Sequence, residues 1–234
     1  MTRFLHCVSP VLLLTVVLAG CSSRDIRKGT IALELGDYTL AMHFFSRVIE
    51  RNPANAEARL GMGKALLQQS SDIPGDSVSW RQAVMHLEAV RTLGKNTEIG
   101  PLLSQVWSER AVGLLRAGDT IRALESLTRS IAADPTCPEP LNLAGIIYFR
   151  MGRAAKARLL FERAIAVDSS SASSLFNLGM LCWEEEQIRD AHDLWLRALK
   201  LSPQDEDFLY WFAVAEKRLR ESTPVVGENS GGDN

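Results

Sequence analysis

The feature that most constrains this chain is an internal period of 34 residues. Three consecutive blocks align without a gap and cover residues 104–137, 138–171 and 172–205. With each block numbered from 1 to 34, small residues stand at positions 8 and 20, and large apolar residues stand at position 24. In order, these residues are Ala111, Gly145 and Gly179, then Ala123, Ala157 and Ala191, then Leu127, Phe161 and Trp195. Small residues let two antiparallel helices approach closely, and large ones fill the space between hairpins. The period therefore predicts a stack of helical hairpins.

The same numbering extends backward over two further units, residues 22–55 and 56–97. The first of these has Gly29 at position 8 and Phe45 at position 24. The second fits only if eight residues are inserted at Ser70–Ser77, where Ser, Asp, Pro and Gly favour a turn. We therefore expect five hairpins, with an inserted loop in the second.

Three other segments complete the predicted organisation. Residues 98–103 form a linker, in which Gly100-Pro101 breaks or begins a helix. Residues 206–221 form a lone capping helix, which a repeat array needs because its last hairpin would otherwise expose an apolar side. Residues 222–234 contain almost no large apolar side chains and are expected to be a disordered tail.

These blocks resemble the tetratricopeptide repeat, whose large, small and proline positions recur every 34 residues. The stretches Leu175–Gly179 and Ala198–Pro203 match its pattern especially well. The resemblance covers about 200 residues. It implies an all-α fold, a right-handed superhelical solenoid of about five helical hairpins plus a C-terminal capping helix. Another array of helical hairpins is the alternative.

The N-terminus is predicted to be a targeting signal rather than part of the fold. The apolar run Val11–Ala19 is about half as long as a membrane-spanning helix, so residues 1–20 are expected to be a signal peptide. The sequence Leu18-Ala19-Gly20-Cys21 resembles the bacterial lipobox, which implies a covalent lipid on Cys21. Ser22 follows the cysteine, and by the same resemblance this favours the periplasmic face of the outer membrane. A plain signal peptide with a chance cysteine is the alternative.

Several functional classes are disfavoured by composition and spacing. A net charge of −2 provides no global basic field for nucleic acid. His43, His86 and His192 fall in second helices of different repeats, so we expect solvated histidines and no shared metal site. Cys137 and Cys182 are almost one and a half units apart and are predicted to be separate thiols. We find no Gly-rich phosphate loop and no catalytic motif, and expect neither enzymatic activity nor a cofactor other than the lipid.

The resemblance also places positions 2, 5, 9 and 12 of each first helix on a concave face. From these positions we predict a protein-binding groove, here called the predicted groove. Its residues are Asn142, Ile146, Phe149, Phe176, Met180, Trp183, Tyr210 and Val214. Family members that grip peptide C-termini have Lys and Asn at positions 5 and 9, and this chain does not. An apolar strip or an amphipathic helix is therefore the expected ligand. The alternatives are that these side chains pack on neighbouring helices or that the tail covers them.

The expected function is a lipid-anchored periplasmic scaffold that helps to assemble an envelope machine. The chain resembles lipoproteins that assist type IV pilus biogenesis by helping the secretin ring reach the outer membrane. Similar repeat lipoproteins act in outer-membrane protein insertion, polysaccharide export or the control of peptidoglycan enzymes, and the fold does not choose among them. A structural lipoprotein that self-associates through its aromatic face, and an enzyme with a site in the loop at 70–77, are the other hypotheses. The oligomeric state stays open.

Overall fold

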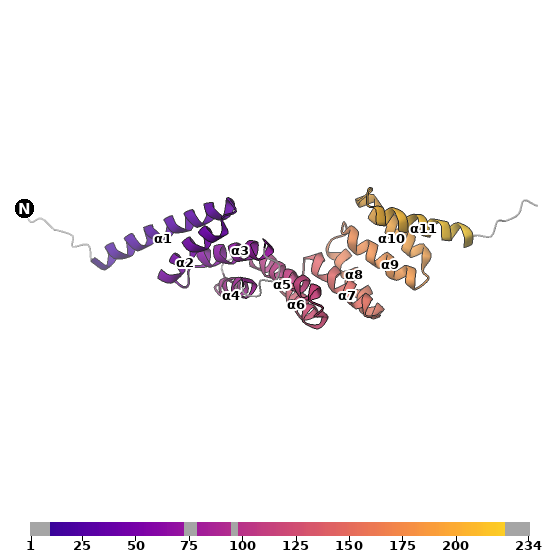
Figure 1. Cartoon of the computed structure of the whole chain (residues 1–234), viewed down its shortest axis with the longest axis horizontal. Helices are drawn as coiled ribbons and strands as arrows, with labels where there is room; N and C mark the ends of the chain where they lie inside the picture. The colour runs from indigo at the N-terminus through magenta and orange to yellow at the C-terminus, as the bar shows by residue number, and fades with distance from the viewer. Residues whose placement is uncertain (1–9, 73–78, 95–97, 223–234) are drawn as a thin grey trace, which may run out of the picture. The chain divides into compact units, whose positions relative to one another are not determined.

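The computed structural model describes residues 10–72, 79–94 and 98–222 (Figure 1). All regular elements within these ranges are α-helices, and the all-α class predicted from the repeat is confirmed for them. The helices are α1 (Pro10–Glu34), α2 (Tyr38–Arg51), α3 (Ala56–Asp72), α4 (Ser79–Thr92), α5 (Ile99–Arg116), α6 (Thr120–Ala133), α7 (Pro138–Arg150), α8 (Ala154–Val167), α9 (Ala172–Glu184), α10 (Ile188–Leu201) and α11 (Glu206–Ser222).

The chain divides into two compact units, Met1–Asp134 and Pro135–Asn234. In the first unit the hairpins are α1 with α2, α3 with α4, and α5 with α6, and consecutive hairpins contact each other. In the second unit α7 pairs with α8 and α9 pairs with α10, while α11 packs on α10. Each unit is therefore a short stack of hairpins whose first helices line up next to one another in sequence order.

The turns inside the hairpins explain the glycines at position 15. Gly118 and Gly152 have φ angles of 79° and 69°, a left-handed conformation that glycine adopts without a clash from a Cβ atom. After the turn, the Asp119 carboxylate accepts a hydrogen bond from the backbone N–H of Arg122 at 3.0 Å and caps the start of α6. In the α9–α10 turn the left-handed position is occupied by Glu186, with a φ of 60°.

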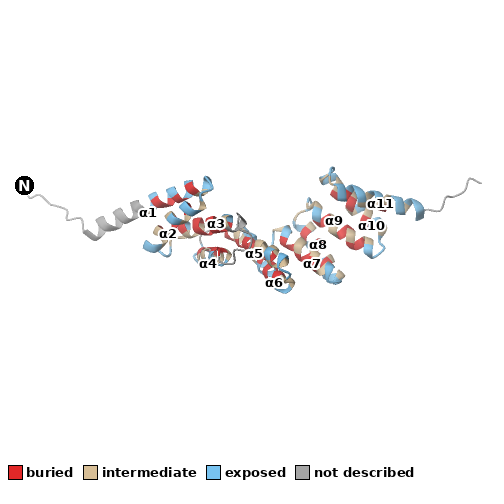
Figure 2. Ribbon diagram, viewed as in Figure 1, coloured by how far each residue is buried: buried red, intermediate tan, exposed pale blue. Residues whose placement is uncertain are grey.

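The small residues at position 8 pack against the large residues at position 24. An ideal Cβ atom at Gly145 would lie 2.5 Å from Cε1 of Phe161, and one at Gly179 would lie 2.5 Å from Nε1 of Trp195. Both rings are fully buried between the helices of their own hairpin. Buried positions alternate with exposed ones along the helices (Figure 2), as expected for amphipathic hairpins.

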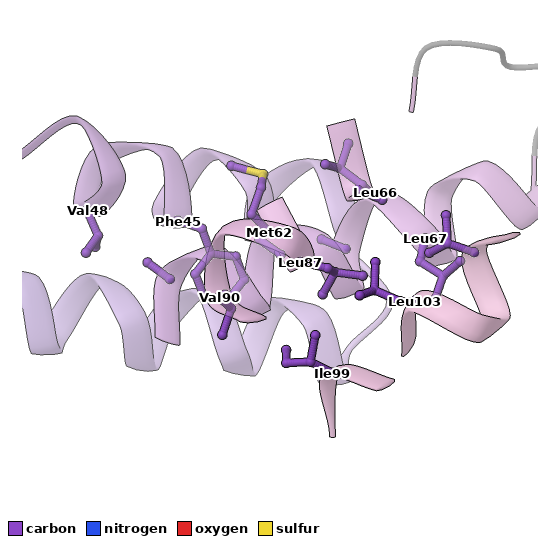
Figure 3. Packing of buried hydrophobic residues seen from close by; sticks show 14 of the residues in the cluster. Phe45, Val48, Met62, Leu66, Leu67, Leu87, Val90, Ile99 and Leu103 are labelled. Atoms are coloured by element: carbon purple, nitrogen blue, oxygen red, sulfur yellow. The ribbon is translucent and has the colours of Figure 1, made fainter. Parts of the chain in front are cut away.

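The first unit keeps a continuous apolar core across the place where the period slips. Figure 3 shows its main residues, which come from α2 to α5: Phe45, Val48, Met62, Leu66, Leu67, Leu87, Val90, Ile99 and Leu103. Ile99 and Leu103 are 1% and 0% exposed. Residues 99–103 are therefore the first turns of α5 and not the predicted linker. Gly100 permits this start, since a Cβ atom there would lie 2.8 Å from the carbonyl oxygen of Ala133 in α6.

Two other element boundaries differ from the prediction. Helix α3 continues through Ser70 and Ser71 to Asp72, so the inserted segment begins later than expected. The rest of the predicted loop, 73–78, lies outside the described residues. Helix α1 begins at Pro10, before the predicted first unit at residues 22–55, because the apolar run before Cys21 continues the helix without a break.

The structure describes only part of the predicted signal peptide and of the predicted tail. Residues 1–9 of the expected signal peptide, and residues 223–234 of the expected tail, lie outside the described ranges. Among the helices in the described ranges, none is both long and apolar enough to cross a membrane. Helix α1 joins the fold from Asp25 onward: Asp25 pairs with Arg51 of α2, and Ile26, Gly29 and Ala32 are buried against the rest of the first unit.

Candidate protein-binding groove

The predicted groove lies entirely within the second unit. Its members stand on three first helices: Asn142, Ile146 and Phe149 on α7, Phe176, Met180 and Trp183 on α9, and Tyr210 and Val214 on α11. Seven of these eight side chains are half-buried, and Tyr210 is 62% exposed. They are therefore neither a closed core nor a fully open surface, and each keeps part of its area available to a partner.

The α7 end of the groove is fixed by a polar contact. The Nδ2 of Asn177 on α9 donates a hydrogen bond to the Oδ1 of Asn142 on α7, at 2.9 Å. Ile146 and Phe149 pack against the apolar cluster of this unit. The amide pair sets the spacing of the two first helices and leaves a polar rim beside the apolar strip.

The α9 and α11 parts of the groove are joined by aromatic rings. Phe176 stacks on Phe208 of α11, with ring centroids 4.8 Å apart. The Trp183 ring lies 5.8 Å from the ring of Trp195 and 5.9 Å from that of Trp211. Each such ring pair contributes about 0.5–1.5 kcal/mol beyond the area that it buries. The contacts hold the rings in place before any ligand binds.

A hollow opens where α9, the α9–α10 turn and α11 meet. It has a volume of about 470 Å³, and we call it the α9–α11 hollow. Its lining residues are Trp183, Glu184, Glu186, Ile188, Val214, Lys217, Arg218 and Glu221. Trp183 and Val214, both members of the predicted groove, provide apolar surface. The surrounding charges have both signs, and Lys217 lies 3.9 Å from the carboxylate of Glu221. An apolar floor with a charged rim suits a ligand that is itself amphipathic.

Sequence reasoning missed the residues by which α11 is anchored. Phe208 is 8% exposed and Ala215 is fully buried, whereas the neighbouring apolar residue Leu209 is 45% exposed. Leu209 occupies position 4, which the second helix of the same hairpin covers in the inner repeats, and within the described residues no second helix follows α11. The spacing of Phe208, Trp211 and Ala215 at i, i+3 and i+7 was a usable signal for this stripe.

In the ranges that the structure describes, no three His, Cys, Asp or Glu side chains are grouped so that they could hold a metal ion. Cys137 and Cys182 are separate thiols that are not joined in a disulfide, as predicted. Burial raises the pKa of the Cys182 thiol, despite the opposing hydrogen bond from Arg158. His192 lies against the Phe212 ring, with centroids 4.8 Å apart.

His86 differs from the expected solvated histidine. Its ring is half-buried, and Nδ1 lies 3.4 Å from Nη1 of Arg59 on α3. Burial and the nearby positive charge of Arg59 both lower the pKa of His86. The imidazole therefore favours its neutral form in the folded chain.

Comparison with known sequences also detects the tetratricopeptide repeat in part of this chain. The sequence profile of the tetratricopeptide repeat matches residues 32–70 and 114–178 of this chain. Human tetratricopeptide repeat protein 6 is 21% identical over 210 aligned residues, which cover 80% of this chain and 40% of that protein. The chain thus spans about two fifths of the length of the curated relative that it matches.

Solved structures of similar fold cover most of the chain. The structure of pilF from Pseudomonas aeruginosa has a TM-score of 0.55 and 15% identity, and the match covers 87% of this chain and 86% of that one. A MamA protein has a TM-score of 0.53 and 17% identity, with 89% and 100% covered. YrrB, described as a tetratricopeptide-repeat protein with an unusual peptide-binding site, has a TM-score of 0.52 and 17% identity, with 82% and 90% covered. The fold predicted from the 34-residue period is thereby confirmed.

Proposed function

We propose that this chain is a non-enzymatic adaptor that binds a protein partner through the predicted groove. The observation that carries this role is the row of rings on α9 and α11, packed on one side and partly open on the other. Tyr210 is 62% exposed, and Trp183 borders the α9–α11 hollow. Rigid aromatic side chains that are partly exposed supply much of the energy at protein interfaces, because little conformational entropy is lost when they are covered.

The chemistry of the groove favours an apolar strip or one face of an amphipathic helix as the ligand. Trp183, Ile188 and Val214 offer apolar surface, while Lys217 and Arg218 stand opposite Glu184 around the hollow. A helix with an apolar face and charged flanks of both signs could contact the apolar residues of the α9–α11 hollow and pair with the charged residues around it. The positions that grip a peptide carboxylate in some repeat proteins carry Phe176 and Met180 here, which supports an apolar ligand.

Substitutions in the groove test this role. Tyr210→Ala should leave the fold intact and weaken partner capture about tenfold or more if Tyr210 is an interface anchor. Trp183→Ala should weaken capture as well, and it also removes ring contacts with Trp195 and Trp211. Leu159→Ala on α8 is the matched control, since Leu159 is 58% exposed and lies outside the groove. Equal capture by the Tyr210 and Leu159 variants would place the binding site elsewhere.

The proposed adaptor is held at the periplasmic face of the outer membrane by a lipid on Cys21. The lipobox-like sequence supports this anchor, and each acyl chain contributes about 0.8 kcal/mol per buried CH₂ group. Residues packed into the fold begin at Asp25 and Ile26, so the tether would be only a few residues long. Labelled palmitate should enter the wild-type chain in cells and not the Cys21→Ala variant. An unlabelled wild-type chain would refute the anchor.

The envelope machine that we favour is the type IV pilus and its secretin ring. The support is the combination of a lipobox with a similar number of repeats directly after it; the similarity to pilF is one of fold. A photo-crosslinker in place of Met180, followed by mass spectrometry, identifies the partner in cells. A secretin or pilus protein in the adduct supports this machine. An insertion-machine, export or peptidoglycan protein would keep the adaptor and change its pathway. No adduct from a folded, membrane-attached probe would overturn the groove.

A further inference from the structure

The first unit carries a second feature, in which two tryptophans are surrounded by arginines. The rings of Trp80 on α4 and Trp107 on α5 lie 5.7 Å apart. The guanidinium of Arg110 is centred 3.7 Å from the Trp80 ring, and that of Arg81 lies 5.5 Å from the same ring. Arg129 on α6 lies 4.8 Å from the Trp107 ring. We call these five residues the Arg–Trp cluster. It brings together side chains from three helices.

Among the described residues, no carboxylate in contact with the cluster balances its positive charge. Two other arginines of this region do have such partners, since Arg91 pairs with Glu88 and Arg122 pairs with Asp119. The three arginines of the cluster have no described carboxylate oxygen within the 4.0 Å of an ion pair. Partial burial lowers the pKa of Arg110, and the nearby positive charges of Arg129, Arg81 and Arg122 lower it further. Glu125 opposes them more weakly than any one of the three.

Stacking on an aromatic ring prepares a guanidinium for a carboxylate. The ring attracts the face of the cation and restricts its rotamers, while the N–H groups at the edge stay in one plane and free to donate. A carboxylate accepts two parallel hydrogen bonds from such an edge. Arg110 and Arg129 therefore form a pre-organised pair of donors on neighbouring helices.

The cluster is distinct from the concave positions of its own repeat. Ser108 and Val112 occupy positions 5 and 9 of the unit that contains α5. Arg110 is two residues from each, and because successive residues of an α-helix are about 100° apart, it projects from the opposite side of α5. The cluster shares no residue with the predicted groove, which belongs to the second unit.

We propose that the Arg–Trp cluster is a second docking surface, and that its occupant is an acidic segment of a partner protein with at least two Asp or Glu side chains. Charge complementarity carries this choice, since three arginines gather here and the described residues place no carboxylate in ion-pair contact with them. The cluster is less suited to a bilayer: the Trp107 ring is 8% exposed and both rings are covered by guanidinium groups, so neither protrudes to enter an interface.

Fluorescence anisotropy of a labelled hexaglutamate peptide, titrated with the full chain at about 25 mM salt, tests the proposal. Wild-type protein should bind the peptide, and binding should weaken as salt is raised. The Arg110→Gln/Arg129→Gln double variant should lose about tenfold or more in affinity, since charge-assisted hydrogen bonds are removed. Arg116→Gln is the matched control, because Arg116 is exposed at the end of α5 and outside the cluster, and it should stay within about twofold of wild type.

A further substitution separates binding from folding. Arg129 is exposed, so Arg129→Glu should leave the chain folded, with at most a small decrease in the unfolding temperature from loss of the contact with Trp107, yet it should weaken hexaglutamate binding more than Arg129→Gln does. Equal binding by wild-type and both Arg129 variants would overturn the proposal. So would the absence of hexaglutamate binding, whether or not vesicles containing phosphatidylglycerol bind instead, since binding to vesicles alone would identify a membrane surface.

Discussion

Replacing Gly179 by alanine tests the packing on which every hairpin of the second unit depends. A Cβ atom at position 179 would lie 2.5 Å from Nε1, 2.7 Å from Cδ1 and 3.0 Å from Cε2 of Trp195. Favourable contacts between non-bonded atoms need about 3.5–4.0 Å. The Trp195 ring cannot move away freely, because it is fully buried and its Nε1–H donates to the carbonyl oxygen of Phe176 at 3.1 Å.

The expected change in the free energy of unfolding is the sum of two costs and one gain. Overpacking a filled core costs about 1–3 kcal/mol. Loss of the Trp195 hydrogen bond adds about 0.5–1.5 kcal/mol. Alanine is favoured over glycine inside a helix by about 1 kcal/mol, which partly offsets both costs. Gly179→Ala should therefore lower the free energy of unfolding by about 0.5–3.5 kcal/mol.

Urea unfolding of the full chain, followed by far-ultraviolet circular dichroism, measures this change. The control is Gly113→Ala in α5, where an added Cβ atom meets nothing within 4 Å. There the same substitution should raise the free energy of unfolding by up to about 1 kcal/mol, because only the helix preference remains. If Gly179→Ala shifts the midpoint upward as Gly113→Ala does, then Trp195 does not pack on Gly179 as described and the repeat numbering is wrong.

Two other predictions concern single residues. Glu186 has a φ of 60°, which costs a non-glycine residue about 1–2 kcal/mol, so Glu186→Gly should raise the free energy of unfolding by about 0.5–1 kcal/mol in urea titrations; a decrease would mean that the Glu186 side chain stabilises the turn. The pKa of His86 is lowered in the folded chain, so the unfolded chain binds the proton first as the pH falls below about 6.5. Stability should decline from there until the pH passes the folded pKa, and His86→Gln should show a smaller decline; identical pH profiles would contradict this reasoning.

The repeat period predicted the inside of each hairpin correctly because that packing is local. Positions 8 and 24 of one block belong to two consecutive helices, and a short turn forces them together. Gly145 and Gly179 therefore had to face Phe161 and Trp195, which the structure shows. The helical class and the tetratricopeptide-repeat fold follow from the same contacts.

The period failed where a residue's role depends on a neighbouring hairpin. Gly100-Pro101 indicated a linker, but Ile99 and Leu103 find an apolar core between α3, α4 and α5, and helix formation follows that burial. In the predicted groove, the sequence placed Phe176 and Trp183 on one face of α9. How much of each ring is covered was decided by α11, whose Phe208 and Trp211 pack against them.

The amino-acid sequence by itself thus determined the helices, their pairing and the small-to-large contacts inside each pair. Only the tertiary structure decided which faces of different hairpins meet. The Arg–Trp cluster shows the difference: Trp107 is 27 residues from Trp80 and 22 residues from Arg129, and neither separation matches the 34-residue period. They come together because α4 packs on α5 and α5 on α6 after the period has slipped. The direction of a side chain around its helix is set within a few residues, whereas its neighbours across a helix interface are set by the packing of whole hairpins.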